Sequence, residues 1–284
     1  MTSAPHSIPR ACVIGWPVAH SRSPLIHRFW LQSLGISGSY ELAAVAPAGF
    51  PDFVRSLGQQ GFVGANVTLP HKQTAFALCD VRLPAAQRLK AVNTLWIEAG
   101  QLCGDNTDCA GFLGAMDQDS PGWDRGPGAA VVLGAGGAAR AIVYALLLRN
   151  ITRIFLVNRT REHATKLAAD FGAPVEVVDF GDLPDAMASA GLLVNTTSLG
   201  MRGQPPLAID LAPLPPHAVV SDIVYVPLET ELLKVAKARG LRAVSGIGML
   251  LHQAVPGFTR WFGKNPHVTA ELRGLAEADI LAGL

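Results

Sequence analysis

The sequence predicts an α/β protein built around parallel β-sheets. Short apolar runs rich in β-branched residues alternate along the chain with segments of helical pattern, and this alternation is typical of parallel sheets covered by helices. A glycine-rich segment at residues 134–139 lies between one such run and a long helical segment, which is where a doubly wound sheet carries its phosphate-binding turn. The chain has 284 residues, and at about 150 residues per domain this length suggests two domains.

The composition argues against several classes of function. Lys and Arg number 23 against 22 Asp and Glu, without a basic block, so nucleic acid binding has little support, because phosphate neutralisation needs clustered cations. The longest apolar stretch, residues 141–148, is far shorter than the roughly 20 residues of a membrane span. The N-terminus does not resemble a secretory signal, and the four cysteines show no metal-ligand spacing. We therefore expect a cytoplasmic protein with buried free thiols, no metal, and no nucleic acid or membrane partner.

The N-terminal part predicts a sheet with one early helix. Ser23 is a suitable N-cap for this helix, Pro24 fits its first position, and Gly35 is a suitable stop. The expected strands are residues 10–15, 39–45 and 62–68, followed by a hairpin of residues 91–97 and 101–106 around Glu98-Ala99-Gly100.

The second half begins after a change in composition. Residues 116–128 are polar and rich in Gly and Pro, so we interpret them as a surface connection close to a domain boundary. A strand, a glycine-rich turn and a long helix follow, and the C-terminal segment from residue 248 is helical in pattern. The further strands expected are residues 152–158, 173–178, 191–195, 218–224 and 241–244.

The glycine-rich turn predicts a dinucleotide site. Its sequence fits G-x-G-x-x-A, and it follows the apolar run at residues 129–133 and opens a helix, which is the context that this motif requires. The glycines let the backbone approach a pyrophosphate, and the helix N-terminus offers free N–H groups to the anion. A glycine-rich packing turn without a ligand is the alternative. The predicted cofactor contacts are Gly134, Ala135, Gly136, Gly137 and Ala138.

The end of the next strand predicts NADP rather than NAD. An NAD site usually places Asp or Glu there, about 20 residues after the glycines, to bind the ribose 2′-hydroxyl. This chain has Asn158, Arg159 and Thr160 instead. A guanidinium suits a 2′-phosphate through charge-assisted hydrogen bonds. The alternative is that Arg159 is a solvated surface cation.

Polar residues in the first half are candidates for a substrate pocket. Ser21 and Ser23 place two hydroxyl donors at a helix N-terminus, which suits a carboxylate, although Ser23 as a plain helix cap is the alternative. Amides and hydroxyls elsewhere suit a polyhydroxylated ring, and Lys72 with Asp108 is a plausible cation–carboxylate pair, unless both are ordinary surface charges. The candidates are Asn66, Thr68, Lys72, Asn93, Asn106, Thr107 and Asp108.

At these residues the chain resembles the shikimate dehydrogenase family, over most of its length and in the same order. The blocks that carry the resemblance are VIGWPVAHSRSPLIH, GANVTLPHK, AVNTL, GDNTDCAGF, GAGGAARA, NRT, VNTTSLGM, DIVYVPLET and SGIGMLLHQA. The resemblance implies reversible NADPH-dependent reduction of 3-dehydroshikimate to shikimate. It makes Lys72 the catalytic acid/base and Asp108 its partner.

The resemblance also extends the site. It assigns the substrate carboxylate to Ser21 and Ser23, and the ring hydroxyls to Thr68, Asn93, Asp108 and Gln253, with Tyr225 nearby. Beside the nicotinamide it places Ile223, Gly246 and Met249. The family often has a second arginine shortly after NRT. Here the residues are Arg161-Glu162-His163, so Arg161 and His163 are alternatives for a second phosphate contact.

The domain boundaries follow from these assignments. Residues 1–108 are expected to form the substrate domain, completed by helices in 246–284, and residues 109–245 the NADP domain, with the active site in the cleft between them. We expect a monomer or homodimer. The alternatives in function are a quinate/shikimate dehydrogenase that uses NAD, a tetrahydrofolate-linked dehydrogenase, and a non-catalytic ligand sensor.

Overall fold

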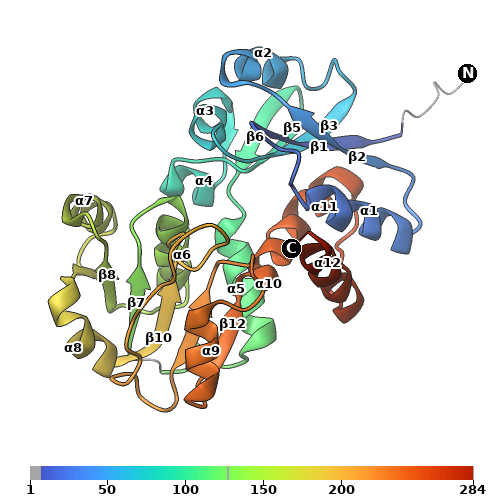
Figure 1. Cartoon of the computed structure of the whole chain (residues 1–284). Helices are drawn as coiled ribbons and strands as arrows, with labels where there is room; N and C mark the ends of the chain where they lie inside the picture. The colour runs from blue at the N-terminus through green and yellow to red at the C-terminus, as the bar shows by residue number, and fades with distance from the viewer. Residues whose placement is uncertain (1–7, 127, 284) are drawn as a thin grey trace, which may run out of the picture. The chain divides into compact units, whose positions relative to one another are not determined.

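The computed structural model describes residues 8–126 and 128–283. The described chain divides into two compact units, whose elements are labelled in Figure 1. The first unit contains the residues up to Thr107 together with Gln253–Ala276. The second contains Asp108–His252 and the described residues from Glu277 onward. Each unit has its own sheet, so the α/β fold class predicted from the sequence is confirmed.

The first unit is a mixed six-stranded sheet in the order β2-β1-β3-β5-β6-β4. The strands β1, β2 and β3 are parallel, whereas β5 runs antiparallel to both β3 and β6. The expected hairpin is present, with a turn formed by Ala99 and Gly100, both at positive φ. The elements are β1 (Arg10–Gly15), α1 (Ser23–Ser33), β2 (Ser39–Ala44), α2 (Phe50–Arg55), β3 (Phe62–Val67), α3 (Lys72–Leu78), β4 (Val81–Arg82), α4 (Pro84–Leu89), β5 (Thr94–Glu98), β6 (Gln101–Asp105) and α11 (Ala254–Phe262).

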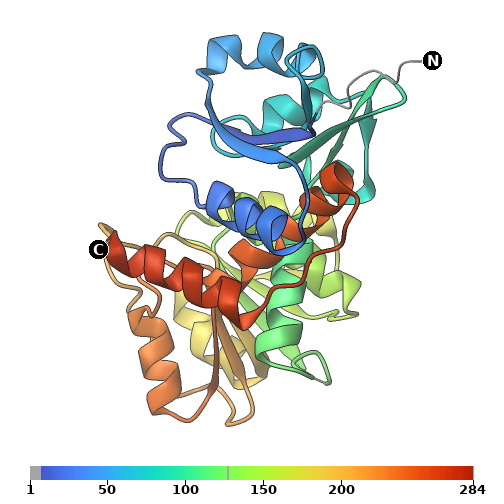
Figure 2. The same ribbon diagram turned by 90° about the vertical axis from the view of Figure 1, so that its right-hand side faces the viewer.

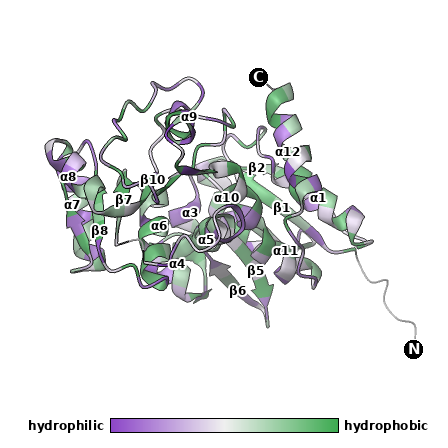
Figure 3. Cartoon of the chain, turned by 90° about the horizontal axis from the view of Figure 1, so that it is seen from below, coloured by the Kyte–Doolittle hydropathy of each residue, from purple (hydrophilic) through white to green (hydrophobic). Residues whose placement is uncertain are grey.

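Helices cover both faces of this first sheet. Figure 2 shows α1 on one side of the β1 and β2 strands and the α2 segment on the other. On the α2 side, Cys12 and Ile14 of β1 pack in one cluster with Phe50 and Val54 of α2. Figure 3 shows β1 mainly in green, as expected for a strand buried on both faces. On the side of α11, Gly64 of β3 leaves room for an indole, because a Cβ there would lie 2.1 Å from Nε1 of Trp261.

The second unit has a fully parallel six-stranded sheet in the order β12-β11-β10-β7-β8-β9. Numbered within the unit, this is the 3-2-1-4-5-6 order of a Rossmann fold read from its β9 edge. The elements are α5 (Asp108–Asp119), β7 (Ala129–Leu133), α6 (Gly137–Leu148), β8 (Ile154–Val157), α7 (Arg161–Phe171), β9 (Val175–Val177), α8 (Leu183–Ala188), β10 (Ala190–Asn195), β11 (Val219–Asp222), α9 (Glu231–Ala238), β12 (Arg242–Ser245) and α10 (Gly246–His252); α12 (Ala270–Ala282) passes from the first unit into the second.

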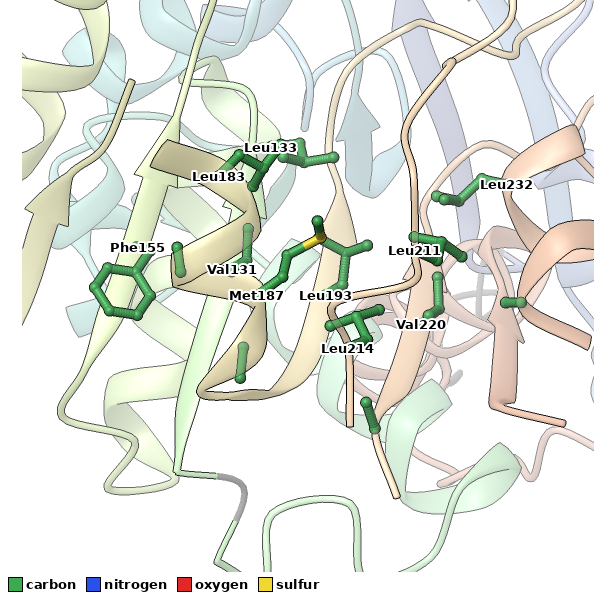
Figure 4. Packing of buried hydrophobic residues seen from close by; sticks show 14 of the residues in the cluster. Val131, Leu133, Phe155, Leu183, Met187, Leu193, Leu211, Leu214, Val220 and Leu232 are labelled. Carbon is green, nitrogen blue, oxygen red and sulfur yellow. The ribbon is translucent and has the colours of Figure 1, made fainter. Parts of the chain in front are cut away.

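One face of the second sheet is packed by aliphatic and aromatic side chains, as Figure 4 shows. Val131 of β7 and Leu193 of β10 lie next to Met187 of α8, and Val220 of β11 continues the cluster toward Leu211. The strands β7, β8, β10 and β11 are buried along their whole length. This explains why the sequences of β7 and β8 are continuously apolar and those of β10 and β11 are apolar up to their polar ends, without the alternation of a half-exposed strand.

Two local expectations were wrong. Ser23 is the first residue of α1, and the N-cap position belongs to Arg22. Residues 116–128 are not simply a surface connection, because α5 continues to Asp119 and both Met116 and Trp123 are buried. The reason is that Trp123 packs edge-on against Phe112, with 6.0 Å between the ring centroids.

The start of the C-terminal helical segment also differs from the expected grouping. Residues 246–252 form α10 and belong to the second unit, whereas we expected them in the substrate domain. The helix packs tightly against α5, because a Cβ on Gly114 would lie 2.6 Å from Nδ1 of His252. The return to the first unit therefore begins at Gln253.

The four cysteines are all buried, as expected, and none forms a disulfide. Across the parts of the chain that the structure describes, each helix is too short or too polar to span a lipid bilayer. The same parts contain no group of three or more His, Cys, Asp and Glu residues placed to hold a metal ion.

A buried histidine lies in the aromatic core of the first unit. His27 is fully buried and stacks on Tyr40, with 4.0 Å between the centroids and 7° between the planes. Trp30, Phe258 and Trp261 complete its surroundings. Neither ring nitrogen has a hydrogen-bond partner among the described residues. Burial therefore lowers the pKa of His27 from 6.5 to about 3, and its polar neighbour Asn66 opposes this shift only in part.

We expect this histidine to make the first unit sensitive to acid. Unfolded chains bind a proton at His27 below pH 6.5, but the folded chain binds it only near pH 3, so this contribution to stability is complete above pH 6.5 and is lost as the pH falls. Between pH 7.5 and 5.0 the loss is roughly 2 kcal/mol. The variant His27→Phe keeps the stacking and should lose less stability over this interval. Urea unfolding followed by tryptophan fluorescence at both pH values measures the difference, and equal losses in the two proteins would contradict the prediction.

Candidate active site

Lys72 lies where the third strand gives way to a helix. After β3, the N–H of Thr68 donates to the carbonyl of Ile14 at 2.9 Å. The N–H of His71 donates to the carbonyl of Thr68 at 3.0 Å, which closes a turn, and α3 then begins at Lys72. The carbonyl of Lys72 accepts from the N–H of Val92 at 2.9 Å. The half-buried lysine side chain therefore extends from a backbone that is held on both sides.

The structure brings Ser21 and Ser23 together at the start of α1. The hydroxyl of Ser21 donates to the hydroxyl of Ser23 at 3.2 Å and accepts from its backbone N–H at 3.3 Å. Both residues are half-buried. Two adjoining hydroxyls at the N-terminus of a helix, where backbone N–H groups lack intrahelical acceptors, suit a carboxylate ligand.

Asn66 and Asn93 are also neighbours. The amide Nδ2 of Asn66 donates to the carbonyl of Asn93 at 3.2 Å and to the hydroxyl of Thr94 at 3.3 Å. Its Oδ1 accepts from the hydroxyl of Tyr40 at 2.6 Å. Burial raises the pKa of Tyr40 well above 10, so the phenol stays a donor and fixes the orientation of the Asn66 amide. Tyr40 could not be identified from the sequence, because nothing in the spacing between β2 and β3 indicates this contact.

The remaining predicted substrate residues belong to different parts of the chain. Gln253 precedes α11 in the first unit, and its carbonyl accepts from the hydroxyl of Thr107 at 2.8 Å. Asp108 is the first residue of α5, and Tyr225 follows β11; both belong to the second unit. The pairing of Lys72 with Asp108 stays a prediction.

The glycine-rich turn has the geometry that a dinucleotide site needs. Gly134 has φ +107°, and a Cβ there would lie 2.6 Å from Oγ1 of Thr196, so only glycine fits. In contrast, a Cβ on Gly136 or Gly137 would meet nothing within 4 Å. The space in front of the α6 N-terminus is open, and no side chain caps this helix. An open helix N-terminus with free backbone N–H groups is what a pyrophosphate requires. Ala135 lies in the loop before α6, and Ala138 lies in the first turn of this helix.

The end of β8 presents polar and cationic groups. Asn158 Nδ2 donates to the carbonyl of Thr160 at 2.7 Å, which orders the loop around the exposed Arg159. In the first turn of α7, the guanidinium of Arg161 forms an ion pair with Asp179. A second phosphate contact from Arg161 would compete with this pair, whereas His163 is exposed in the same turn.

A buried polar network joins the ends of β10 and β11. Asp222 is completely buried, and its carboxylate accepts from Asn195 Nδ2 at 2.9 Å, from the N–H of Val224 at 3.0 Å and from the hydroxyl of Thr230 at 2.7 Å. Burial raises its pKa above 3.8, and these donors oppose the shift. The network holds the loop that carries the predicted residues Ile223 and Tyr225. The sequence indicates this network only by the polar residues at the ends of the two apolar strands, Asn195 in β10 and Asp222 in β11.

The start of α10 approaches this loop closely. A Cβ on Gly246 would lie 2.1 Å from the carbonyl oxygen of Ile223, so glycine is required here. The two predicted nicotinamide residues Ile223 and Gly246 are therefore in contact, and half-buried Met249 follows one turn later in the same helix.

These features define a class of protein. A parallel sheet in Rossmann order, with an open glycine turn at the N-terminus of the helix after its first strand, is the architecture of a dinucleotide-binding domain. The comparisons with known proteins narrow this class. Residues 13–95 match the shikimate dehydrogenase substrate binding domain, and residues 127–201 match the shikimate / quinate 5-dehydrogenase domain.

Similar proteins extend the match over both units. The shikimate dehydrogenase (NADP(+)) of Methylocella silvestris is 62% identical over 272 residues, which cover 96% of this chain and 97% of the relative. The protein of the same name from Rhodopseudomonas palustris is 58% identical over 95% of this chain and 96% of the relative. The chain belongs to the shikimate dehydrogenase family.

Solved structures agree with this assignment. Shikimate 5-dehydrogenase from Thermus thermophilus in complex with NADP(H) and shikimate has a TM-score of 0.84 and 36% identity, and covers 98% of this chain and 100% of its own. Quinate dehydrogenase from Corynebacterium glutamicum in complex with NAD has a TM-score of 0.87 and 31% identity, and covers 95% of this chain and 99% of its own.

Proposed function

We propose that this protein catalyses the reversible NADPH-dependent reduction of 3-dehydroshikimate to shikimate, a step of aromatic amino acid biosynthesis. The observation that carries the proposal is the similarity to a shikimate dehydrogenase (NADP(+)) over 96% of this chain, and the open glycine turn is consistent with a bound dinucleotide. We also propose that it works in the cytoplasm, as a monomer or homodimer, without a nucleic acid or membrane partner.

We assign each polar group of the substrate to side chains that can form hydrogen bonds with it. Ser21 and Ser23 bind the carboxylate with their adjoining hydroxyls. The ring hydroxyls are bound by amide and hydroxyl groups together with Asp108, and Tyr225 lies nearby. The amide and hydroxyl residues proposed for this role are Asn66, Thr68, Asn93 and Gln253.

Reduction of a ketone requires a hydride at carbon and a proton at oxygen. NADPH supplies the hydride when it is bound at the glycine turn. Lys72 donates the proton to the developing alkoxide, and as a neutral amine it accepts the proton back when shikimate is oxidised. Asp108 orients the ammonium group and stabilises its charge. Because hydride transfer needs donor and acceptor in contact, we propose that the bound nicotinamide lies directly against the ring of the substrate during the reaction.

We assign the pyrophosphate, the 2′-phosphate and the nicotinamide of the cofactor to separate groups of residues. The turn from Gly134 to Ala138 binds the pyrophosphate, and Arg159, flanked by Asn158 and Thr160, binds the 2′-phosphate. Ile223, Gly246 and Met249 contact the nicotinamide. A guanidinium at the end of β8, in place of a carboxylate, favours NADP because a carboxylate would repel the phosphate.

A second candidate is quinate oxidation with NAD, and the high TM-score of the Corynebacterium quinate dehydrogenase favours it. Arg159 at the end of β8 argues against NAD. The test is a spectrophotometric assay at the absorbance of NADPH that crosses shikimate and quinate with NADP and NAD. We expect the highest kcat/KM for shikimate with NADP. Equal or better turnover of quinate with NAD would overturn the proposal in favour of the second candidate, and no turnover with any pair would support a non-catalytic sensor.

A further inference from the structure

The side-chain oxygen of Asn93 accepts two hydrogen bonds beside the sheet of the first unit. Asn93, which is only 4% exposed, precedes β5. Its Oδ1 accepts from the backbone N–H of Thr107 at 2.9 Å and from the hydroxyl of Thr94 at 3.0 Å. These two donors fix the orientation of the amide. In the proposed site Asn93 binds a ring hydroxyl through its Nδ2 donor group, whose direction is set by that of the oxygen.

The hydroxyl of Thr107 has one proton and three oxygen neighbours, of which the hydroxyl of Thr94 is the most distant, at 3.4 Å. The Thr107 hydroxyl lies 2.8 Å from the carbonyl oxygen of Gln253 and 3.1 Å from Oδ1 of Asn93. The carbonyl of Gln253 is the closer acceptor, and Oδ1 of Asn93 already receives two donors, so the hydroxyl proton is assigned to Gln253. Thr107 is 2% exposed, so water does not compete for this bond.

Thr107 is thus bonded to two residues that are far apart in the sequence and both belong to the proposed substrate site. Its backbone N–H fixes the amide of Asn93, and its hydroxyl fixes the backbone at Gln253, where the chain enters α11. All three residues lie in the first unit. The next residue in the chain is Asp108, the proposed partner of the catalytic lysine.

We propose that Thr107 is a positioning residue for the substrate: it orients the donor group of Asn93 and holds Gln253 in register with it, without touching the substrate itself. The inference rests on the proposed function, because it needs a substrate whose ring hydroxyls are bound by Asn93 and Gln253. A preorganised amide loses less freedom on binding, so the effect falls on substrate affinity and not on the cofactor.

The test compares Thr107→Val, which keeps the shape but removes the hydroxyl, with Thr107→Ser, which keeps the hydroxyl. We expect Thr107→Val to raise KM for shikimate about tenfold, with KM for NADP changed less than about twofold and kcat lowered less than about fivefold. Thr107→Ser should restore KM for shikimate to within about threefold of the unmodified protein. Thr107→Ala replaces the valine variant if the latter does not fold, with the same split expected.

A matched control comes from the second unit. The hydroxyl of Thr196, also buried, donates to the carbonyl of Leu133 at 2.6 Å beside the glycine turn. Thr196→Val removes a bond of the same kind, and we expect it to raise KM for NADP and not KM for shikimate. A normal KM for shikimate in both Thr107→Val and Thr107→Ala, or an equal rise for both ligands, would overturn the inference. The proposed function fails separately, if the unmodified protein does not turn over shikimate.

Discussion

Replacing Lys72 by alanine should lower kcat for shikimate oxidation about 1,000-fold, while KM for shikimate changes less than about threefold. The reason is that a positioned acid/base contributes roughly 10²–10⁴ to the rate of a proton transfer, whereas the substrate carboxylate and hydroxyls are bound by other groups. An interaction made mainly in the transition state affects kcat and kcat/KM equally. Steady-state kinetics with saturating NADP measure both constants.

Two further variants distinguish proton transfer from simple charge. Lys72→Arg keeps a cation at the start of α3, but a guanidinium does not release its proton in proteins. We expect this variant to be as inactive as Lys72→Ala. The exposed Lys264 of the same unit is the control, and Lys264→Ala should keep normal kinetics. Substantial activity in Lys72→Arg would show that only the positive charge is needed, and near-normal turnover in Lys72→Ala would remove Lys72 from the mechanism.

The architecture was largely predictable because the four central strands of the second unit, β7, β8, β10 and β11, are buried along their whole length. Runs such as residues 129–133 and 191–194 contain no polar side chain, and glycines follow the first of them at the turn that opens α6. Such local patterns depend only on neighbouring residues. The prediction that Ser23 caps α1 was wrong for a different reason. A serine in the first turn of a helix cannot be distinguished by sequence from a serine just before that turn.

The contacts that organise the site depend on residues far apart in the chain. The bond between Thr107 and Gln253 joins positions 146 residues apart, and the hydroxyl of Tyr40 reaches Asn66 from a non-adjacent strand of the same sheet. The burial of Asp222 also follows from strand order and not from its neighbours. Residue types indicated that the site is rich in donors and acceptors, but only the fold shows which of them orient each other.

The second prediction of large effect concerns the 2′-phosphate. Replacing Arg159 by alanine should lower kcat/KM for NADP about 100-fold and leave kcat/KM for NAD within about threefold, because NAD has no phosphate for the guanidinium to bind. A charge-assisted hydrogen bond contributes about 1.5–3 kcal/mol. A 100-fold change in kcat/KM corresponds to about 2.7 kcal/mol and lies within these limits. The ratio of kcat/KM values for the two cofactors measures the effect independently of any change in the amount of active protein.

Two further variants, Arg161→Ala and His163→Ala, test which of these residues makes a second contact with the 2′-phosphate. The guanidinium of Arg161 is already paired with Asp179, and a bound phosphate would have to displace or share this exposed pair. Because exposed pairs contribute only about 0–1 kcal/mol, the pair weakens but does not prevent such a contact. We therefore expect Arg161→Ala to lower the NADP/NAD ratio by less than about tenfold, and far less than Arg159→Ala. A larger fall in His163→Ala would assign the second contact to the histidine.

If Arg159→Ala left the ratio unchanged, the 2′-phosphate would be bound elsewhere, and the prediction of NADP from the end of β8 would be wrong.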